Sequence, residues 1–327
     1  MQSNQGTDDS DHIILPLVNK DEENVVFPLV LNVLSRFWGE EIPIAEIEKR
    51  SSLYKNFKGI IFIEGLEIIE KNLNLSSIIY RGSIADIKKR VSQGFPVIVV
   101  LPGIGDVVQF ATIVCGYDNK ENRIITYIPE PDSYGAIPEN TFEYEWSQDD
   151  FFSILIFPKD MTDIFRNDIF DFARSNRIYL EIERLKLQGR LNESLDILNS
   201  IIDNESSTNK EINPQILCLL AGILNELNDK KCISLYEKAI ELNPRFYLAY
   251  RGLGNYYLKN KNYNLSKEYY LKAVEINPIR FGPIYKNLGI VILELGDKDS
   301  AKSYFKIYLE QVPNASDKEN ILQFINS

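Results

Sequence analysis

A short motif that recurs at an almost constant interval in the second half of the chain constrains its fold more than any other feature. The segments YEKAIELNP, YLKAVEINP and FKIYLEQVP end at Pro244, Pro278 and Pro313, so successive copies lie 34 and 35 residues apart. A period of this length indicates repeated helix pairs, because one pair cannot bury its own apolar face and stacks on its neighbours. The second half is therefore expected to be a helical array.

The interior of each copy agrees with this interpretation. A large residue followed by a small one recurs in the first helix of each pair, as in Leu253-Gly254 and Leu288-Gly289. The pattern resembles the tetratricopeptide repeat family over roughly half of the chain, which implies an all-α solenoid over residues 161–327. The best copies are residues 213–246, 247–280 and 282–315, and a degenerate fourth at about 175–205 keeps only the period.

The resemblance also implies a peptide-binding surface. In the tetratricopeptide repeat family, fixed positions of the first helix face the concave side, where a basic residue and an asparagine hold a peptide carboxylate. The matching residues here are Arg251, Asn255 and Lys259 in one copy and Lys286 in the next. We expect these four side chains to contact a peptide. The alternative is that they are solvated polar residues on an exposed helix.

The first half of the chain has a different pattern, in which amphipathic helices precede apolar strands. Expected helices cover residues 27–39, 42–51, 62–75 and 83–94, and expected strands cover 95–101, 109–118, 122–129 and 151–158. Helices followed by antiparallel strands predict an α+β domain over residues 13–160. The polar, acidic residues 1–12 are expected to form a flexible segment.

The order of these elements resembles the papain-like double-glycine leader peptidases. Val26 occupies the position of the family's nucleophilic cysteine, thirteen residues before the closing Gly39. The run GFPVIVVL resembles the family's Gly-x-Pro-Val strand, and FATIVCGYD resembles its His-strand-Gly-Tyr-Asp run. Phe142 and Trp146 resemble its Phe-x-x-x-Trp. The resemblance implies a papain-like cysteine-peptidase-like fold, and the combination with tetratricopeptide repeats is a known bacterial arrangement.

The catalytic positions of this family are replaced in the present chain. A thiol peptidase needs a cysteine at a helix N-terminus and a histidine that takes its proton. Val26 stands at the cysteine position, and Phe110, or Gln109 with a one-residue slip, stands at the histidine position. The expected groove, near Val26, Phe27, Phe110 and Tyr127, would then bind an extended peptide without cutting it. The alternative is that Val26 and Phe110 fill the former site as core residues.

A relocated catalytic pair is the alternative that keeps an enzymatic activity. His12 is the single histidine of the chain, and Cys115 lies on an expected internal strand. Because His12 ends the expected flexible segment, the two residues would meet only after a fold-back that we do not expect. The three cysteines, Cys115, Cys218 and Cys232, match no zinc-ligand spacing, and we read them as buried apolar residues without metal or cofactor.

The charge distribution restricts the class of partner. Residues 1–160 carry 14 Lys and Arg against 25 Asp and Glu, and residues 161–327 carry 22 of each class. Since neither half has a basic excess, nucleic acid is not an expected partner. The sequence lacks a run of eighteen apolar residues, so no transmembrane segment is expected. The acidic start would suit a processed lipoprotein of the bacterial cell envelope, and a cytoplasmic location is the alternative.

These observations predict a non-catalytic protein- or peptide-binding scaffold. Its partner would occupy the concave face of the repeats, the former peptidase groove, or both. The alternative function is a hydrolase or peptidase of unrecognised mechanism that uses a relocated set of catalytic residues.

Overall fold

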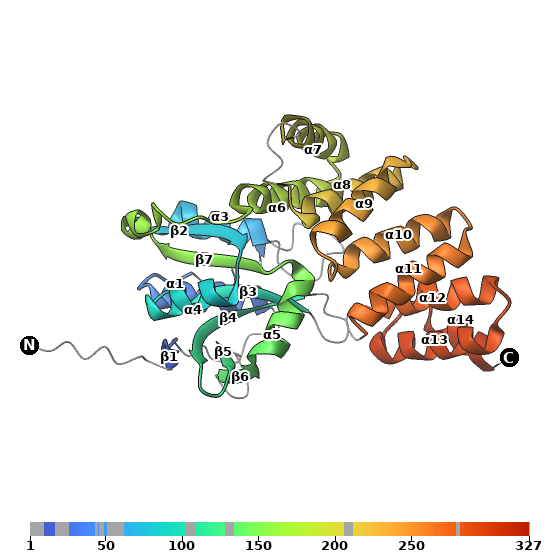
Figure 1. The fold of residues 1–327 in the computed structure, drawn as a ribbon, viewed down its shortest axis with the longest axis horizontal. Coiled ribbons are helices and arrows are strands. Elements are labelled where there is room, and N and C mark those ends of the chain that lie inside the picture. The colour runs from blue at the N-terminus through green and yellow to red at the C-terminus, as the bar shows by residue number, and fades with distance from the viewer. Residues whose placement is uncertain are drawn as a thin grey trace, which may run out of the picture. The chain divides into compact units, whose positions relative to one another are not determined.

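The computed structural model describes residues 10–16, 26–42, 45, 49–50, 62–102, 109–127, 134–205, 212–278 and 282–326. Contacts between residues divide the chain into two compact units. We call Met1–Leu101 with Phe110–Arg190 the sheet unit, and Pro102–Gln109 with Leu191–Ser327 the repeat unit. Figure 1 draws both units with their elements labelled.

The sheet unit contains an antiparallel sheet. Its strands among the described residues are β1 (Ser10–His12), β2 (Leu75–Arg81), β3 (Val97–Pro102), β4 (Gln109–Asp118), β5 (Arg123–Tyr127), β6 (Tyr134–Pro138) and β7 (Phe152–Pro158). The strand order is β2-β7-β3-β4-β5-β6, and β1 pairs with β4. The pair β2 and β7 is in register from Leu75 opposite Pro158 to Arg81 opposite Phe152.

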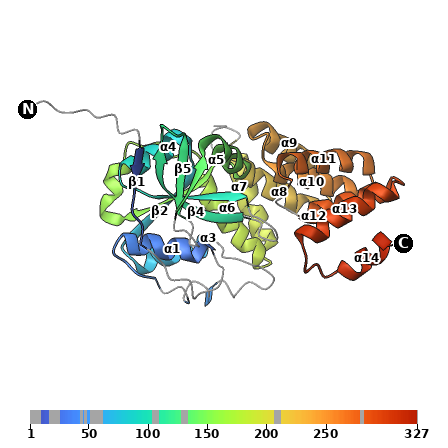
Figure 2. The ribbon, with the colours of Figure 1, turned by 90° about the horizontal axis from the view of Figure 1, so that it is seen from below.

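Both faces of this sheet are covered, which explains the continuous apolar runs of its strands. Alternate residues of a strand point to opposite faces, and Ile98 and Ile154 enter one core while Val97 and Leu155 enter the other. The first core contains residues of α1 (Val26–Phe37) and α3 (Phe62–Asn72), and the second those of α4 (Ile84–Ser92) and α5 (Glu139–Trp146). Figure 2 shows the two helix pairs on opposite sides of the strands.

Two helices of the sheet unit show sequence signals at one end. Ser83 caps α4 by accepting a hydrogen bond from the backbone N–H of Asp86 at 3.1 Å. Gly39, just after α1, has a φ of 79°, a conformation that glycine adopts at low cost. The expected helix over 42–51 lies largely outside the described residues. Strands β2 and β6 were not expected from the sequence.

The N-terminal strand differs from the sequence-based expectation. Ser10–His12 lies within the segment expected to be flexible, yet it forms β1. His12 pairs with Gly116 of β4, and the backbone N–H of Ile13 donates to the carbonyl of Cys115 at 2.7 Å. The physical reason is that β4 offers unpaired backbone groups at Gly116–Asp118, which an extended polar segment can satisfy.

The unit boundary also differs from the expected one near residue 160. The 3₁₀ helix η2 (Lys159–Phe165) and helix α6 (Ala173–Leu187) belong to the sheet unit. Arg177 of α6 holds the carboxylate of Glu70 through two hydrogen bonds of 2.8 Å, and Arg184 reaches Glu67 at 2.8 Å. These ion pairs join α6 to α3. At residue 160 the sequence changes from apolar strand runs to helical repeats, and this change coincides with the end of β7. The compact sheet unit nevertheless continues through α6.

A buried arginine connects α4 to the segment that precedes α6. Arg90 is 2% exposed, and its Nε donates to Asp86 Oδ1 at 3.0 Å while its Nη1 donates to Asp168. The guanidinium also lies over the ring of Phe170, 4.9 Å from its centroid. This network fixes the chain between η2 and α6 against the second core.

The repeat unit consists of helices. They are α7 (Leu191–Glu205), α8 (Pro214–Glu226), α9 (Lys231–Leu242), α10 (Tyr247–Lys259), α11 (Tyr263–Ile276), α12 (Gly282–Glu294), α13 (Lys298–Gln311) and α14 (Lys318–Asn326). Helices α8 to α13 form three consecutive pairs, which coincide with the three best copies of the repeat. In Figure 1 these pairs follow one another along the unit.

Candidate functional site

The helix pairs pack through glycines that admit an aromatic ring. A Cβ atom on Gly254 of α10 would lie 2.6 Å from the ring of Tyr270, and one on Gly289 of α12 would lie 2.7 Å from the ring of Phe305. The two contacts are equivalent, because both glycines and both rings are 35 residues apart. The small residues predicted from the sequence therefore allow the first and second helices to approach each other.

The predicted ligand residues lie on the first helices of two successive pairs. Arg251, Asn255 and Lys259 are on α10, with the first two half-buried and Lys259 exposed. Lys286 is on α12 and is 37% exposed. Arg251 and Lys286 occupy equivalent positions, since they are 35 residues apart.

Asn255 is part of a hydrogen-bonded cluster that spans three helices. Its Oδ1 accepts a hydrogen bond from the hydroxyl of Tyr270 at 2.6 Å and one from Nδ2 of Asn287 at 3.2 Å. Asn287 Nδ2 also lies 3.0 Å from the Tyr270 hydroxyl oxygen. The cluster links α10, α11 and α12. Asn255 therefore contacts both helices that pack against α10 and fixes the register between two successive repeats.

Asn287 was missed by the sequence analysis. It follows Lys286 directly, and the expected surface positions included Lys286 and not its neighbour. A signal was present, because an asparagine inside an apolar helix such as GPIYKNLGIVILE needs hydrogen-bond partners. We define the polar face as Arg251, Asn255, Asn287 and Lys286.

Arg251 lies four residues before Asn255 on α10, so both side chains start from the same face of the helix. Burial raises the pKa of Tyr270 well above its ordinary value, and the hydrogen bond from Asn287 and the charge of Arg251 oppose that rise. The phenol therefore stays protonated and acts as a neutral donor. Arg251 acts in the same way on the pKa of Tyr236, which burial also raises. A guanidinium one helical turn from an amide that is held by hydrogen bonds is an arrangement that suits a carboxylate ligand.

Lys259, which the sequence placed among the peptide-binding residues, has hydrogen-bond partners within the chain. Its Nζ donates to the backbone carbonyls of Asn225 at 3.0 Å and Glu226 at 3.4 Å. Both carbonyls lie in the last turn of α8, where a cation complements the helix dipole. Lys259 therefore joins two repeats. These hydrogen bonds explain the orientation of its side chain, and no ligand is needed to explain it.

Lys286 contacts the segment that precedes the last helix. Its Nζ lies 2.5 Å from Oδ2 of Asp317, and the hydroxyl of Tyr308 donates to Oδ1 of the same carboxylate at 3.0 Å. Burial raises the pKa of Asp317, but the hydrogen bonds from Lys286 and Tyr308 outweigh it, so that the pKa lies below its ordinary value. Lys286 thus holds an anionic group of its own chain.

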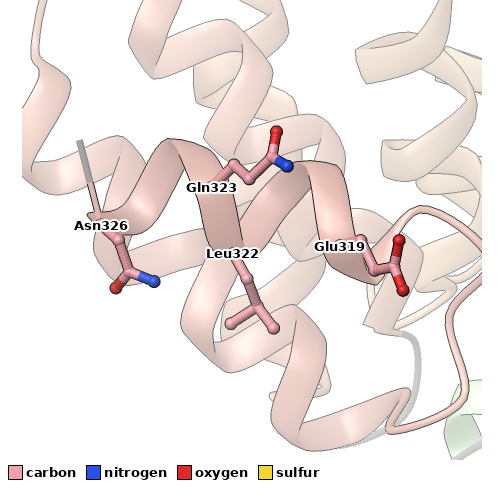
Figure 3. A pocket seen from close by; sticks show the side chains of 4 residues that line it. All are labelled: Glu319, Leu322, Gln323 and Asn326. Carbon is pink, nitrogen blue, oxygen red and sulfur yellow. The ribbon is translucent and has the colours of Figure 1, made fainter.

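A shallow hollow lies along α14 at the end of the repeat unit. Figure 3 shows its lining side chains, Glu319, Leu322, Gln323 and Asn326, spaced along this one helix. All four are exposed. Because one helix supplies the whole lining, this hollow lacks the convergent polar groups of a ligand site.

Of the residues expected to line a groove in the sheet unit, Tyr127 is the one whose side chain is described. Val26 is the first residue of α1, and Gln109 and Phe110 begin β4, but their side chains, like that of Phe27, lie outside the described residues. Tyr127 at the end of β5 is 1% exposed and belongs to the first core. Tyr127 is therefore a core residue.

The structure corrects the expected separation of His12 and Cys115, because β1 does fold back onto β4. The chemistry still does not favour a thiol nucleophile. Cys115 is buried in the first core, its Sγ points to the carbonyl of Ile125 at 3.7 Å, and burial raises the pKa of the thiol to about 12. The exposed ring of His12 instead meets the ring of Tyr134 edge-on at 4.8 Å. A thiolate at Cys115 is thus strongly disfavoured.

Among the described residues, no group of three or more His, Cys, Asp or Glu side chains could hold a metal ion. Each helix within the same ranges is too short or too polar to span a bilayer.

Comparisons with known proteins find similarity to tetratricopeptide repeats in the second half of the chain. A family model described as tetratricopeptide repeat matches residues 235–268, which cover parts of α9 and α11 and the whole of α10. The second half of the chain contains a tetratricopeptide-type helical solenoid. Among curated proteins, anaphase-promoting complex subunit 3 of Schizosaccharomyces pombe is 29% identical over 118 residues. That match covers 36% of this chain and 18% of the length of the relative.

Solved structures with a similar arrangement include three repeat proteins. A MamA double mutant is 20% identical with a TM-score of 0.39, and the match covers 46% of this chain and 81% of that one. PilF of Pseudomonas aeruginosa is 19% identical with a TM-score of 0.39, covering 45% and 66%. The first TPR domain of Spaghetti (RPAP3), bound to the HSP90 peptide SRMEEVD, is 18% identical with a TM-score of 0.33, covering 35% and 94%.

Proposed function

We propose that this protein is a non-catalytic scaffold whose tetratricopeptide repeats bind a segment of a partner protein through a carboxylate. The observation that carries the proposal is the polar face, where Arg251 lies one helical turn before Asn255, whose amide is hydrogen-bonded to Tyr270 and Asn287. A carboxylate placed there would accept charge-assisted bonds from Arg251, which are stronger than bonds between neutral groups.

The cluster supports binding because its groups are already held in place. Tyr270 is fully buried, and its hydroxyl and both asparagine amides are fixed by mutual hydrogen bonds. A site whose groups are ordered before binding loses less side-chain entropy when a ligand arrives. Lys286 on the next helix would extend the site toward a second acidic group of the ligand.

We further propose that the sheet unit is a papain-like relative that has lost its catalytic residues. Val26 at the N-terminus of α1 and Gln109 or Phe110 at the start of β4 supply neither a thiol nor an imidazole. The buried thiol of Cys115, with its raised pKa, is a poor replacement. The proposal is thus that any peptide bound by this unit would remain intact.

An array of random heptapeptides tests both parts of the proposal. We expect the full-length chain to bind a subset of peptides with a free C-terminal carboxylate, and to bind the amidated copies of that subset more weakly. Mass spectrometry after prolonged incubation should recover these peptides uncleaved. Equal binding of free and amidated copies would contradict the carboxylate site, and specific cleavage would contradict the non-catalytic assignment.

A further inference from the structure

The segment that precedes the last helix brings an acidic side chain to the polar face. Lys286 stands at the position equivalent to Arg251, 35 residues further along the chain. Its ammonium group lies 2.5 Å from Oδ2 of Asp317, whose Oδ1 accepts the hydrogen bond from Tyr308. One carboxylate is therefore held by a cation and a phenol hydroxyl, which are the groups that would hold a carboxylate of a ligand.

Each of the two equivalent cations interacts with a tyrosine of a second helix, although Tyr270 and Tyr308 are 38 residues apart and do not occupy equivalent positions. Arg251 acts on the hydroxyl of Tyr270 from the second helix of its pair, and Lys286 lies 5.9 Å from the ring centroid of Tyr308, also from a second helix. Each position thus combines a cation with a tyrosine. Lys286 and Tyr308 already hold Asp317, so this half of the polar face has an anion bound to it.

The segment that carries Asp317 is anchored on one side. The backbone carbonyl of Asp317 accepts a hydrogen bond from the N–H of Ile321 at 3.1 Å, and α14 has nine residues, a length at which an isolated helix is marginal. Ile321 enters the core of α12 and α13, and Phe324 meets the ring of Phe305 edge-on at 5.6 Å. The opposite side of α14, with Glu319, Leu322, Gln323 and Asn326, is exposed (Figure 3).

We propose that Asp317 is an internal ligand of the polar face, which occupies the Lys286 subsite until an acidic side chain of a bound peptide replaces it. This inference rests on the proposed function and adds regulation to it. The ion pair is partly exposed, at 37% for Lys286 and 24% for Asp317, and exposed pairs are weak. The internal carboxylate is therefore a competitor that a peptide can displace, and α14 moves away from α12 when it does.

Peptide affinity in four full-length variants tests the inference, with the free-acid heptapeptide array as the probe. Asp317→Asn keeps an oxygen that can accept the Tyr308 hydroxyl but removes the charge. We expect peptides that contain Glu or Asp to bind this variant about two- to fivefold more tightly than the wild type. In the Lys286→Ala background, Asp317→Asn should change affinity by less than a factor of two. The matched control Asp299→Asn, an exposed acid in the first turn of α13, should leave affinity unchanged.

Hydrogen exchange in α14 provides a second readout. Saturation with an acidic peptide should speed exchange of the amides of residues 318–326 in the wild type. Unchanged or weaker affinity in Asp317→Asn, or slower exchange in α14 on binding, would overturn the inference while the proposed function stands. If the wild type itself binds free-acid and amidated peptides equally, both the inference and the proposed function are overturned.

Discussion

Replacing Arg90 by alanine should lower the free energy of unfolding of the sheet unit by about 3 kcal/mol. The guanidinium is 2% exposed, it binds Asp86 and Asp168, and the hydroxyl of Tyr80 donates to the second oxygen of Asp86 at 2.6 Å. Alanine would leave two carboxylates without their buried cation. Denaturant titration followed by tryptophan fluorescence measures this unit alone, because both tryptophans of the chain, Trp38 and Trp146, lie in it.

Lys89→Ala is the matched control, since Lys89 binds the same carboxylate of Asp168 at 2.8 Å from a side chain that is 49% exposed. Its loss should cost less than about 1 kcal/mol. The hydrogen bonds from Lys89 and Arg90 hold the pKa of Asp168 below its ordinary value of 3.8. The stabilisation is therefore present above that pH and is lost as the pH falls through the lowered pKa, so Arg90→Ala should also reduce the acid sensitivity of the unit. If Arg90→Ala and Lys89→Ala lower the free energy of unfolding equally, the burial of Arg90 does not determine its contribution to stability.

Gly252→Ala should destabilise the repeat unit by about 2–3 kcal/mol. A Cβ atom on Gly252 of α10 would lie 2.2 Å from Cε1 of Tyr236, whose ring is 3% exposed and has little room to move. The added methyl must push α10 away from α9 or force the ring from its rotamer. Faster amide hydrogen exchange in α9 and α10, measured by mass spectrometry on the full-length chain, would report the loss.

Gly222→Ala is the control, because Gly222 lies near the same tyrosine ring but its replacement should stabilise the repeat unit. A Cβ on Gly222 of α8 would lie 3.8 Å from the hydroxyl oxygen of Tyr236, which is an ordinary contact. Alanine in a helix interior is favoured over glycine by about 0.5–1 kcal/mol, so this variant should exchange more slowly. Slower exchange in both variants would mean that the repeat pairs are not as closely packed as the glycines indicate.

The repeat unit was predictable from the sequence because its packing recurs. Leu253-Gly254 and Leu288-Gly289 mark the same contact in two copies, so one local pattern identified several helix pairs at once. Non-recurring contacts were not predictable in this way. The hydrogen bond between Asn255 and Asn287 joins residues 32 positions apart, and only the crossing of α10 and α12 brings them together.

The sheet unit was predictable to a smaller extent. Apolar runs identified β3, β4, β5 and β7, because strands covered on both faces are apolar throughout. The edge strands β2 and β6 contain serines, glycine and proline, and β1 is polar, so none of them has the apolar run of an inner strand. The partners of β1 and β2, which are β4 and β7, also lie far away in the sequence. The assignment of α6 to this unit depends on its ion pairs with Glu67 and Glu70, which leave no local signal.

The sequence supplied the candidate site residues but not their partners within the chain. Arg251 and Asn255 lie one turn apart on α10, and Asn255 accepts a hydrogen bond from Tyr270 of the next helix. Lys259 and Lys286 have partners within the chain, since a long cationic side chain on a helix reaches carbonyls or carboxylates of the neighbouring repeat. The position of a residue in the repeat fixes where its Cα atom lies on the helix. The neighbouring helices determine which groups its side chain can bind.

The central claim is that a carboxylate of a bound peptide contacts Arg251, and a double-mutant cycle on the full-length chain tests it most directly. The cycle combines Arg251→Ala with C-terminal amidation of the tightest peptide from the array. Each change alone should weaken binding about tenfold or more, and the second should add almost nothing once the first is made. If amidation weakens binding as much in Arg251→Ala as in the wild type, the carboxylate does not contact Arg251 and the account is wrong.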